Sequence, residues 1–268
     1  MSHAPTVDEL LTREIGLDPA AIGDVAIDLA LRSRMKALGV SSEESYLSRL
    51  ALGPAERHAL VEEVVVGETW FFREKAAFAL LVAFARRRRM ESPARPLRIL
   101  SAPCATGEEP YSAAMALLDA QLPESAFEID AVDVSAHALA AAEAGVYGPR
   151  SSRDAPVPLH HLRETAAGRS MVSPRVRSRV RFLRGNLVDP LFLAGTAPYD
   201  AVFCRNVLIY MTKGARRTVL DHLVRLVAPG GILFMGHAEA VNLMDPRWRP
   251  SDGPPEAFAF VRAAESAA

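Results

Sequence analysis

Apolar positions in the first 90 residues recur at the spacing of helices. Between residues 24 and 38, Ile27, Leu31 and Met35 follow one another every four residues, and Gly39 then ends the segment. The same kind of pattern predicts three further helices, at residues 42–50, 54–65 and 75–90. No strand pattern interrupts these segments, so we predict an all-helical N-terminal domain over residues 1–90.

Beyond Pro93 and Pro96 the pattern changes to short apolar runs that alternate with helical segments. These runs predict five strands, at residues 97–102, 127–132, 180–183, 199–204 and 232–235. Strands that alternate with helices indicate a mostly parallel sheet covered on both faces. We therefore predict an α/β domain over residues 91–268, with its ligand site at the carboxyl ends of the strands.

The alternation breaks between Gly145 and Asn186. This stretch contains nine arginines and only two acidic residues. Within it, Arg177, Arg179 and Arg181 alternate with valines, as on a strand that has one solvated face. We predict a small basic β insertion at about residues 146–180.

The charge balance argues against an overall attraction to nucleic acid or to anionic lipid. The chain of 268 residues has 31 basic and 32 acidic side chains, which gives a net charge of −1. Its residues are 50% hydrophobic and 24% charged, as in ordinary globular proteins. No apolar run approaches the roughly 18 to 20 residues that cross a bilayer. We expect a monomeric cytoplasmic protein that neither binds nucleic acid nor inserts into a membrane.

Two cysteines, Cys104 and Cys204, are too few for a disulfide framework and lack the spacing of metal ligands. The count alone leaves one bridge open, but two reduced thiols fit a cytoplasmic protein better. We expect no metal site.

The turn after the first predicted strand contains Gly107 followed by Glu108 and Glu109. It lacks the Gly-x-Gly-x-x-Gly pattern that lets a pyrophosphate approach the backbone, which disfavours a nicotinamide dehydrogenase. Two carboxylates would repel phosphate, but they can accept hydrogen bonds from a cationic or amine-bearing ligand. The turn therefore favours a ligand that carries an amino group.

Asp133 stands at the end of the second predicted strand. A carboxylate in this position can accept hydrogen bonds from both hydroxyls of a ribose. The alternative is a structural role as the N-cap of the helix that starts near Ala136. A ribose-bearing ligand without a diphosphate points to S-adenosylmethionine.

Two further segments have both a structural and a chemical interpretation. Tyr210 follows the fourth predicted strand, where it is either a packed aromatic residue or a residue that faces the reacting group. Thr69-Trp-Phe-Phe-Arg73-Glu74 places three aromatic side chains in a row, typical of a plug between helices and sheet. Arg73 is then either in a salt bridge or within the site.

Several strings occur in order along the chain. They are residues 69–74 (TWFFRE), 104–112 (CATGEEPYS), 133–135 (DVS), 145–147 (GVY), 186–187 (NL), 203–210 (FCRNVLIY) and 236–239 (GHAE). Together they resemble the chemoreceptor glutamate methyltransferases of bacterial chemotaxis, the CheR family. The resemblance runs from the N-terminal helices to about Phe260. It implies a Rossmann-like methyltransferase sheet behind an N-terminal helical domain.

The resemblance also implies roles for individual residues. The S-adenosylmethionine pocket would consist of Thr69, Arg73, Glu109, Asp133, Asn186, Leu187, Cys204 and Arg205. Asp133 would hold the ribose, Glu109 the ammonium, and Asn186 and Leu187 the adenine. Arg73 and Tyr210 would line the methyl-transfer site as catalytic residues. Gly67 departs from the family, which usually has Asn two residues before the threonine.

The implied activity is protein-glutamate O-methylation of the cytoplasmic helical region of chemoreceptors (methyl-accepting chemotaxis proteins), with S-adenosylhomocysteine as product. Two other interpretations share the cofactor site: a methyltransferase for another protein or small acid, and a non-catalytic cofactor sensor. For a glutamate-rich receptor helix we expect a basic docking surface. The candidates are the arginine-rich insertion and a group on the N-terminal helix, namely Arg32, Arg34 and Lys36.

Overall fold

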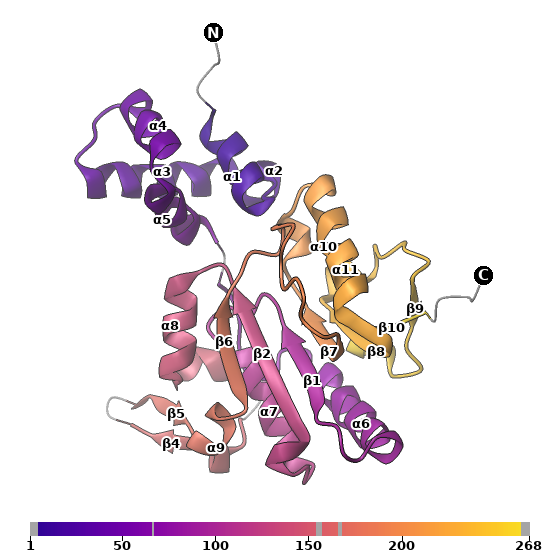
Figure 1. Ribbon diagram of the computed structural model, residues 1–268. Helices are drawn as coiled ribbons and strands as arrows, with labels where there is room; N and C mark the ends of the chain where they lie inside the picture. The colour runs from indigo at the N-terminus through magenta and orange to yellow at the C-terminus, as the bar shows by residue number, and fades with distance from the viewer. Residues whose placement is uncertain (1–4, 66, 154–156, 166–167, 264–268) are drawn as a thin grey trace.

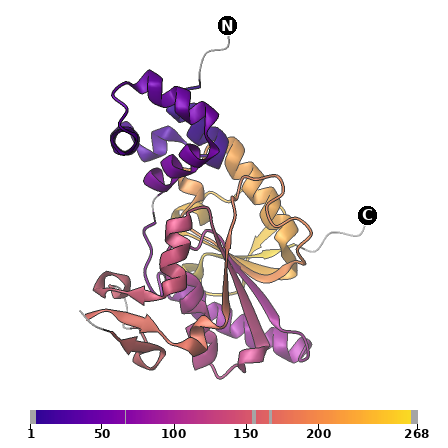
Figure 2. The same ribbon diagram turned by 60° about the vertical axis from the view of Figure 1, so that its left-hand side comes forward.

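The structure, a computed structural model, describes residues 5–65, 67–153, 157–165 and 168–263. Five helices come first: α1 (Val7–Ile15), α2 (Pro19–Ile22), α3 (Asp24–Leu38), α4 (Glu43–Leu52) and α5 (Pro54–Val64). Their own hydrophobic core includes the fully buried Leu11, Tyr46 and Leu50. Figures 1 and 2 show these helices as one group at one end of the sheet.

The next helix, α6 (Ala76–Glu91), packs with the sheet and not with the N-terminal helices. Its buried residues Phe78, Leu81 and Phe84 belong to the core that also contains Ile99 of the first strand. The predicted N-terminal domain ended after this helix, at residue 90. In terms of packing, the helical group ends with α5.

The main sheet of the described chain has seven strands in the order β6-β2-β1-β7-β8-β10-β9. They are β1 (Leu97–Ser101), β2 (Phe127–Asp133), β6 (Val180–Arg184), β7 (Tyr199–Cys204), β8 (Val227–Met235), β9 (Trp248–Pro250) and β10 (Ala259–Arg262). The pairs from β6 to β8 are parallel, while β10 is antiparallel to β8 and to β9. The predicted α/β class is confirmed. The two antiparallel strands at the edge were not predicted, because they are short and interrupted by charged residues and proline.

Helices cover both faces of the sheet (Figure 1). Ile99 packs in a core that includes residues of α6 and α7 (Glu108–Asp119), while the next residue, Leu100, packs in a core with residues of α10 (Lys213–Leu226). Successive side chains of a strand point to opposite faces, so the continuous apolar run of β1 supplies both cores. α8 (Ala136–Ala144) follows β2.

The insertion forms a separate antiparallel sheet of β3 (Val146–Tyr147), β5 (Ser170–Val172) and β4 (Leu162–Glu164). The predicted strand alternation of Arg177 and Arg179 is wrong, because residues 174–177 form a short helix, α9 (Pro174–Arg177). Pro174 occupies the first helical turn, where proline is well tolerated. The strand begins only at Val180.

The order of the strands determines where a ligand can bind. β1 lies at the centre of the parallel region, with β2 on one side and β7 on the other. The connections after β1 and β7 therefore leave the same edge of the sheet, which is the usual binding crevice of such folds. Among the residues described, none of the helices combines the length and the apolar character needed to cross a membrane.

Candidate functional site

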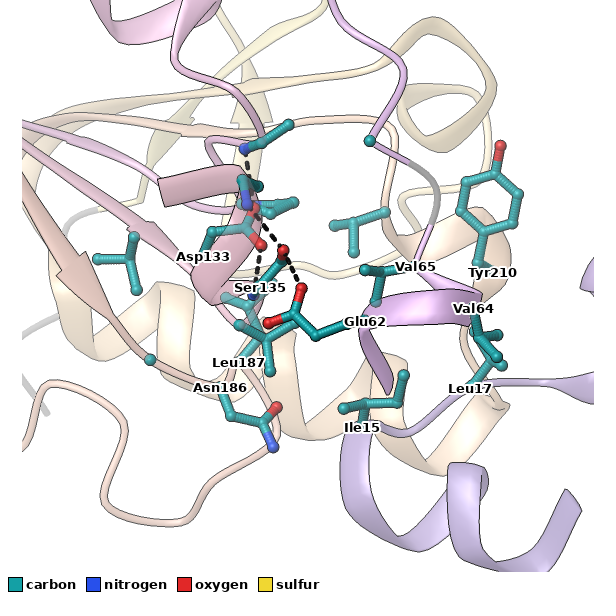
Figure 3. Close-up of a pocket in the computed structure, with 18 of the residues that line it drawn as sticks. Ile15, Leu17, Glu62, Val64, Val65, Asp133, Ser135, Asn186, Leu187 and Tyr210 are labelled. Carbon is teal, nitrogen blue, oxygen red and sulfur yellow. Dashed lines mark hydrogen bonds between the residues drawn. The ribbon is translucent and has the colours of Figure 1, made fainter. Parts of the chain in front are cut away.

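Two cavities adjoin at the carboxyl ends of the parallel strands. The larger has a volume of about 200 Å³ and lies between the strand ends and the N-terminal helices (Figure 3). The smaller has a volume of about 50 Å³ and lies beside residues 68–73. Pro103, Ala105 and Asn206 line both of them, so the two cavities form adjacent halves of one site.

The N-terminal helices provide an apolar wall of the larger cavity, made of Ile15, Leu17, Ile22, Val64 and Val65. The loop after α1 is fixed to the segment after β7: the Asp18 N–H donates to the Tyr210 carbonyl at 2.8 Å, and the Thr212 N–H donates to the Gly16 carbonyl at 2.9 Å. Gly16 has a φ of +72°, and a Cβ there would lie 2.4 Å from the Ala215 Cβ. This close approach requires glycine.

Asp133 lies on the opposite wall, at the end of β2, with 7% of its surface exposed. Its two carboxylate oxygens accept from the Ala105 N–H at 2.8 Å and from the Ser135 N–H at 2.9 Å. The N-cap of α8 is Ser135, not Asp133, which removes the structural alternative considered from the sequence. Burial raises the pKa of Asp133, against the opposing effect of the backbone donors. Each oxygen keeps a lone pair with which to accept from a ligand hydroxyl.

Glu62 of α5 joins this wall, and the sequence reasoning missed it. Its carboxylate accepts from the Ser135 hydroxyl and from the Ala136 N–H, the latter at 2.6 Å (Figure 3). A carboxylate at a helix N-terminus is favourable to the helix dipole. Glu62 therefore connects the N-terminal helices to α8 at the rim of the larger cavity.

Asn186 and Leu187, predicted to flank adenine, both line the larger cavity. The Asn186 amide donates to the Glu14 carbonyl at 2.6 Å, and its oxygen accepts from the Val188 N–H at 3.2 Å. The Asn186 side chain thus fixes α1 against the loop after β6. Leu187 is buried and adds apolar surface on the same side.

The smaller cavity is formed around a buried ion-pair network. The Arg205 guanidinium, with 2% of its side chain exposed, pairs with Glu109 at 2.9 Å and with Glu74 at 2.7 Å. Ser101 donates to the second oxygen of Glu109 at 2.8 Å. Burial raises the pKa of Glu109, against the attraction of Arg205. The Arg205 Nε is buried without a hydrogen-bond partner in the described structure.

This network suits a zwitterionic ligand. One guanidinium pairs with two carboxylates, Glu109 and Glu74, whose remaining lone pairs can accept from a ligand ammonium. A buried charge must be paired and hydrogen-bonded to persist. The unpartnered Nε of Arg205 is a donor that a ligand carboxylate can accept from.

Thr69 and Arg73, also predicted for the cofactor pocket, line the smaller cavity. The Arg73 guanidinium lies 4.3 Å from the centre of the Trp70 ring and donates to the Glu68 carbonyl at 3.1 Å. Within the described chain it makes no ion pair with a carboxylate, so the salt-bridge alternative for Arg73 does not hold. Its cationic head is available at the cavity.

Cys204 does not line either cavity, although the resemblance implied that it does. Its side chain is fully buried in the core beneath the sheet, and both Cys204 and Cys104 are free thiols. The lining residue is instead Asn206, two positions further on, which the sequence reasoning missed. Side chains of a strand alternate between the two faces, so the last residue of β7 points into the core.

Tyr210 lines the larger cavity, across from Asp133 in Figure 3. It closes a short 3-10 helix, Leu208–Tyr210, and packs partly against the N-terminal helices. Arg73 and Tyr210, expected to share the methyl-transfer site, thus line different cavities, on either side of the shared Asn206. Their catalytic roles remain predictions.

Glu239 holds the loop between β7 and Tyr210 in place. This buried carboxylate accepts from the N–H groups of Asn206, Val207 and Leu208 at 2.7–2.8 Å. It belongs to the last of the strings quoted above, for which the sequence suggested no role. Its function in the structure is to satisfy three backbone donors in a turn that forms no sheet.

Comparisons with known proteins agree with this geometry. Residues 67–254 match the family model described as CheR methyltransferase, SAM binding domain. The chain is 46% identical over 262 residues to the "Probable biofilm formation methyltransferase WspC" of Pseudomonas aeruginosa, covering 97% of this chain and 62% of that protein. It is 40% identical to the protein of the same name from Pseudomonas putida, covering 94% of this chain and 60% of the relative.

A third relative is covered almost over its full length. The chain is 36% identical over 240 residues to "Chemotaxis protein methyltransferase 2" of Pseudomonas aeruginosa, covering 87% of this chain and 84% of that protein. In contrast, the chain spans only about three fifths of the length of the two biofilm relatives.

The family model is that of an S-adenosylmethionine-binding domain, and the parallel sheet has its two cavities at the strand ends, so the chain is an S-adenosylmethionine-dependent methyltransferase. Within that class, the chain belongs to the CheR methyltransferase family. The predicted family, fold and cofactor class are confirmed.

Proposed function

We propose that this chain transfers the methyl group of S-adenosylmethionine to the side-chain carboxylate of glutamates in a chemoreceptor-type protein. The observation that carries the proposal is the pair of adjoining cavities at the strand ends. The larger is mainly apolar, with the carboxylates of Asp133 and Glu62 in its lining, and the smaller is charged around Arg205.

The two halves match the two halves of the cofactor. Adenosine would occupy the larger cavity, with Leu187 beside the base and Asp133 accepting from the ribose hydroxyls. The amino-acid end would occupy the smaller cavity, with its ammonium at Glu109 and its carboxylate near Arg205 and Arg73. The sulfonium would then lie where the cavities meet, near Asn206.

The reaction needs alignment more than acid–base chemistry. A glutamate side chain has a reference pKa of about 4.3, so it is already a carboxylate nucleophile near neutral pH. One carboxylate oxygen forms a bond to the methyl carbon while the carbon–sulfur bond breaks, and the electron pair stays on sulfur. The enzyme has to bring the reacting atoms within about 3 to 3.5 Å in line. Among the residues that the structure describes, no histidine lines the smaller cavity, and His137 lines the larger one with 89% of its side chain exposed.

Arg73 and Tyr210 flank the junction of the cavities and would position the substrate. Arginine can pair with a carboxylate through two parallel hydrogen bonds, and the stacking of Arg73 on Trp70 limits its orientations. The Tyr210 hydroxyl would donate to the second carboxylate oxygen. Both residues would orient the carboxylate nucleophile without neutralising its negative charge.

The receptor would dock on the exposed face of α3. Val25, Leu29, Arg32 and Lys36 follow one another at helical spacing and are all exposed, Val25 to 75% and Leu29 to 63%. A mixed apolar and basic stripe fits a glutamate-rich amphipathic helix. Arg34 was expected on this surface, but it is a partly buried partner of Glu56, with both contacts at 2.9 Å. The sequence could not distinguish Arg34 from the exposed Arg32 and Lys36, because its partner Glu56 lies on another helix, α5.

Methyl transfer is tested directly with labelled S-adenosylmethionine and receptor-containing membranes, followed by mass spectrometry of receptor peptides. We expect base-labile methyl esters on glutamates. The higher identity to the biofilm formation relatives favours a receptor of such a pathway over a motility receptor. Label on a small acid or on another protein, with none on receptors, would contradict the substrate assignment.

The docking surface is tested by reversing Arg32 and Lys36 to Glu. Surface charge mainly sets the encounter rate and its dependence on salt. We expect receptor methylation to slow most at low ionic strength, with unchanged cofactor affinity. The same reversal at Arg163 and Arg169 of the insertion is the matched control, and we expect it to leave the rate unchanged. A rate that responds only to the insertion variant would place docking there instead.

A further inference from the structure

Three side chains converge at a point away from the cofactor cavities, where the insertion meets the main domain. The Nε2 atoms of His160 and His161 lie 2.7 and 2.8 Å from the same oxygen of Asp119, Oδ1. One potential ligand atom from each of the three residues lies within 4.8 Å of the other two. Asp119 is the last residue of α7, while the histidines belong to the 3-10 helix Leu159–His161.

The backbone keeps the two imidazoles in place. The His161 N–H donates to the Pro158 carbonyl at 3.0 Å, and the Ser173 N–H donates to the His161 carbonyl at 2.8 Å. The two rings lie 4.2 Å apart, tilted by 46°. The cluster thus presents both Nε2 atoms to one position from a rigid support.

We propose that Asp119, His160 and His161 bind a divalent transition-metal ion, with Zn²⁺ as the preferred occupant. Two imidazole nitrogens and one carboxylate oxygen are ligands typical of zinc, which takes four ligands in a tetrahedron. His161 is buried, while His160 and Asp119 expose 64% and 36% of their side chains. Water can therefore reach the fourth position.

The charge and spacing of the cluster suit a cation. Asp119 ends a helix, where the partial negative charge of the terminal carbonyls favours a positive ion. Ligand atoms about 2.0 to 2.2 Å from zinc lie about 3.3 Å apart in a tetrahedron. A separation of 2.7–2.8 Å reaches this value after small rotations of the side chains.

The alternative is a cluster held by hydrogen bonds alone, in which both Nε2 atoms carry protons and donate to Asp119. An Nε2 atom that binds a metal ion cannot keep its proton. The metal-site hypothesis therefore predicts one bound ion per chain, whereas the hydrogen-bonded alternative predicts none. No spacing motif in the sequence indicates this site, because Asp119 is 41 residues from His160. The expectation of no metal site rested on the two cysteines.

An ion here would link the insertion to α7. The insertion in turn contacts the segment beside the smaller cavity: the Phe71 N–H donates to the Ser151 carbonyl at 2.8 Å, and Arg153 pairs with Glu68 at 2.8 Å. The proposed ion is thus distinct from the cofactor cavities.

The test uses the chain without a histidine tag, treated with EDTA and then titrated with Zn²⁺ by calorimetry and with Co²⁺ by absorption. We expect one equivalent to bind with a Kd of about micromolar or below, with the visible bands of tetrahedral Co²⁺. Saturation should raise the Tm, because the ion binds the folded chain. His160→Ala and Asp119→Asn should weaken binding at least tenfold and abolish the rise.

His58→Ala, at an exposed histidine of α5, is the matched control and should bind as the unchanged chain does. Circular dichroism and S-adenosylhomocysteine binding show whether each variant is folded. Absence of stoichiometric binding in the folded, unsubstituted chain would overturn the proposal. Binding that is unchanged in folded His160→Ala and Asp119→Asn would overturn it equally, because the ion would then lie elsewhere.

Discussion

The two cavities of the cofactor site share three lining residues but are built from different interactions. The larger cavity has an aliphatic wall from the N-terminal helices and two carboxylates, Glu62 and Asp133, of which Asp133 is anchored by backbone N–H groups. The smaller cavity combines apolar side chains with charged ones, and its Arg205 pairs with Glu109 in the lining and with Glu74 behind it. Under the proposed function, one edge of the sheet would provide an apolar half for the nucleoside and a charged half for the amino acid.

The difference also concerns which parts of the chain each cavity needs. Closure of the larger cavity depends on contact between the N-terminal helices and the sheet, through residues such as Leu17 and Glu62. Among the described residues, those that line the smaller cavity all lie between positions 68 and 206. Substitution of Arg205 in the smaller cavity should therefore mainly lower stability, while substitutions of Asp133 and Gly67 in the larger cavity should mainly change cofactor affinity.

The largest effect on stability is expected from Arg205→Met. Removing one partner of a buried ion pair destabilises by about 3 to 5 kcal/mol, because the remaining charges stay buried without compensation. Here Glu74 and Glu109 would be left together. Urea unfolding measures the change. Arg175→Met, at an exposed pair with Glu124, is the control and should change stability by about 1 kcal/mol or less.

Arg73→Ala and Tyr210→Phe should affect turnover more than cofactor binding. Removing one donor that stabilises a transition state lowers kcat on the order of 100-fold. Single-turnover methylation and S-adenosylhomocysteine titration separate the two effects. A variant that methylates receptor at the unchanged rate has no catalytic role at that position. Arg73 also borders the cofactor half, so Tyr210→Phe is the cleaner variant.

Asp133→Ala should weaken S-adenosylmethionine and S-adenosylhomocysteine alike. Losing hydrogen bonds to a charged acceptor costs roughly 1.5 to 3 kcal/mol, or about ten- to a hundredfold in Kd. Calorimetry measures both ligands. Asp133 also accepts from two backbone N–H groups, so Asp133→Asn and a thermal unfolding curve are needed as controls. Equal affinity in all three proteins would remove Asp133 from the site.

Cofactor affinity should fall on acidification, beginning above the usual titration range of aspartate. Burial raises the pKa of Asp133, so the proton returns to this carboxylate at a higher pH than in a free side chain. Below that pKa the Kd should rise by about tenfold per pH unit, since one acceptor position is lost. Adenosine, which lacks the amino-acid end, isolates this effect from the titration of Glu109. A flat profile for adenosine would contradict the assignment.

The smallest effect is expected at Gly67, which lines the larger cavity. A Cβ added there meets nothing within 4 Å, so the Asn usual in the family fits without strain. Gly67→Asn should tighten cofactor binding about two- to tenfold, the value of one added net hydrogen bond. Gly148→Asn, at another open glycine, should have no effect. Weaker binding in Gly67→Asn would mean that the glycine is needed for space.

The pattern of the sequence predicted most of the sheet, because its strands are buried on both faces and appear as continuous apolar runs. β1, β2 and β7 were found within a residue or two of their bounds. The edge strands β9 and β10 were missed, since they are short and partly exposed. α6 was found as a helix but assigned to the wrong neighbours, because periodicity does not say against what an apolar face packs.

The site residues also divide into those that the sequence could predict and those that it could not. Asp133 was predicted from the residues themselves, because the end of a strand is visible in the pattern and a carboxylate there has few roles. Glu62, Asn206 and the Arg34–Glu56 pair could not be predicted, since each depends on a contact between segments far apart in the chain.

By itself the sequence determined the order of the parallel strands and their helices and the family, since both depend on local periodicity and on strings of adjacent residues. Only the tertiary structure decided that Cys204 points into the core and that Arg73 and Tyr210 line separate cavities. It alone brought Asp119 to His160 and His161. The physical reason is that side-chain direction and long-range proximity follow from how the elements pack, which no short stretch of sequence specifies.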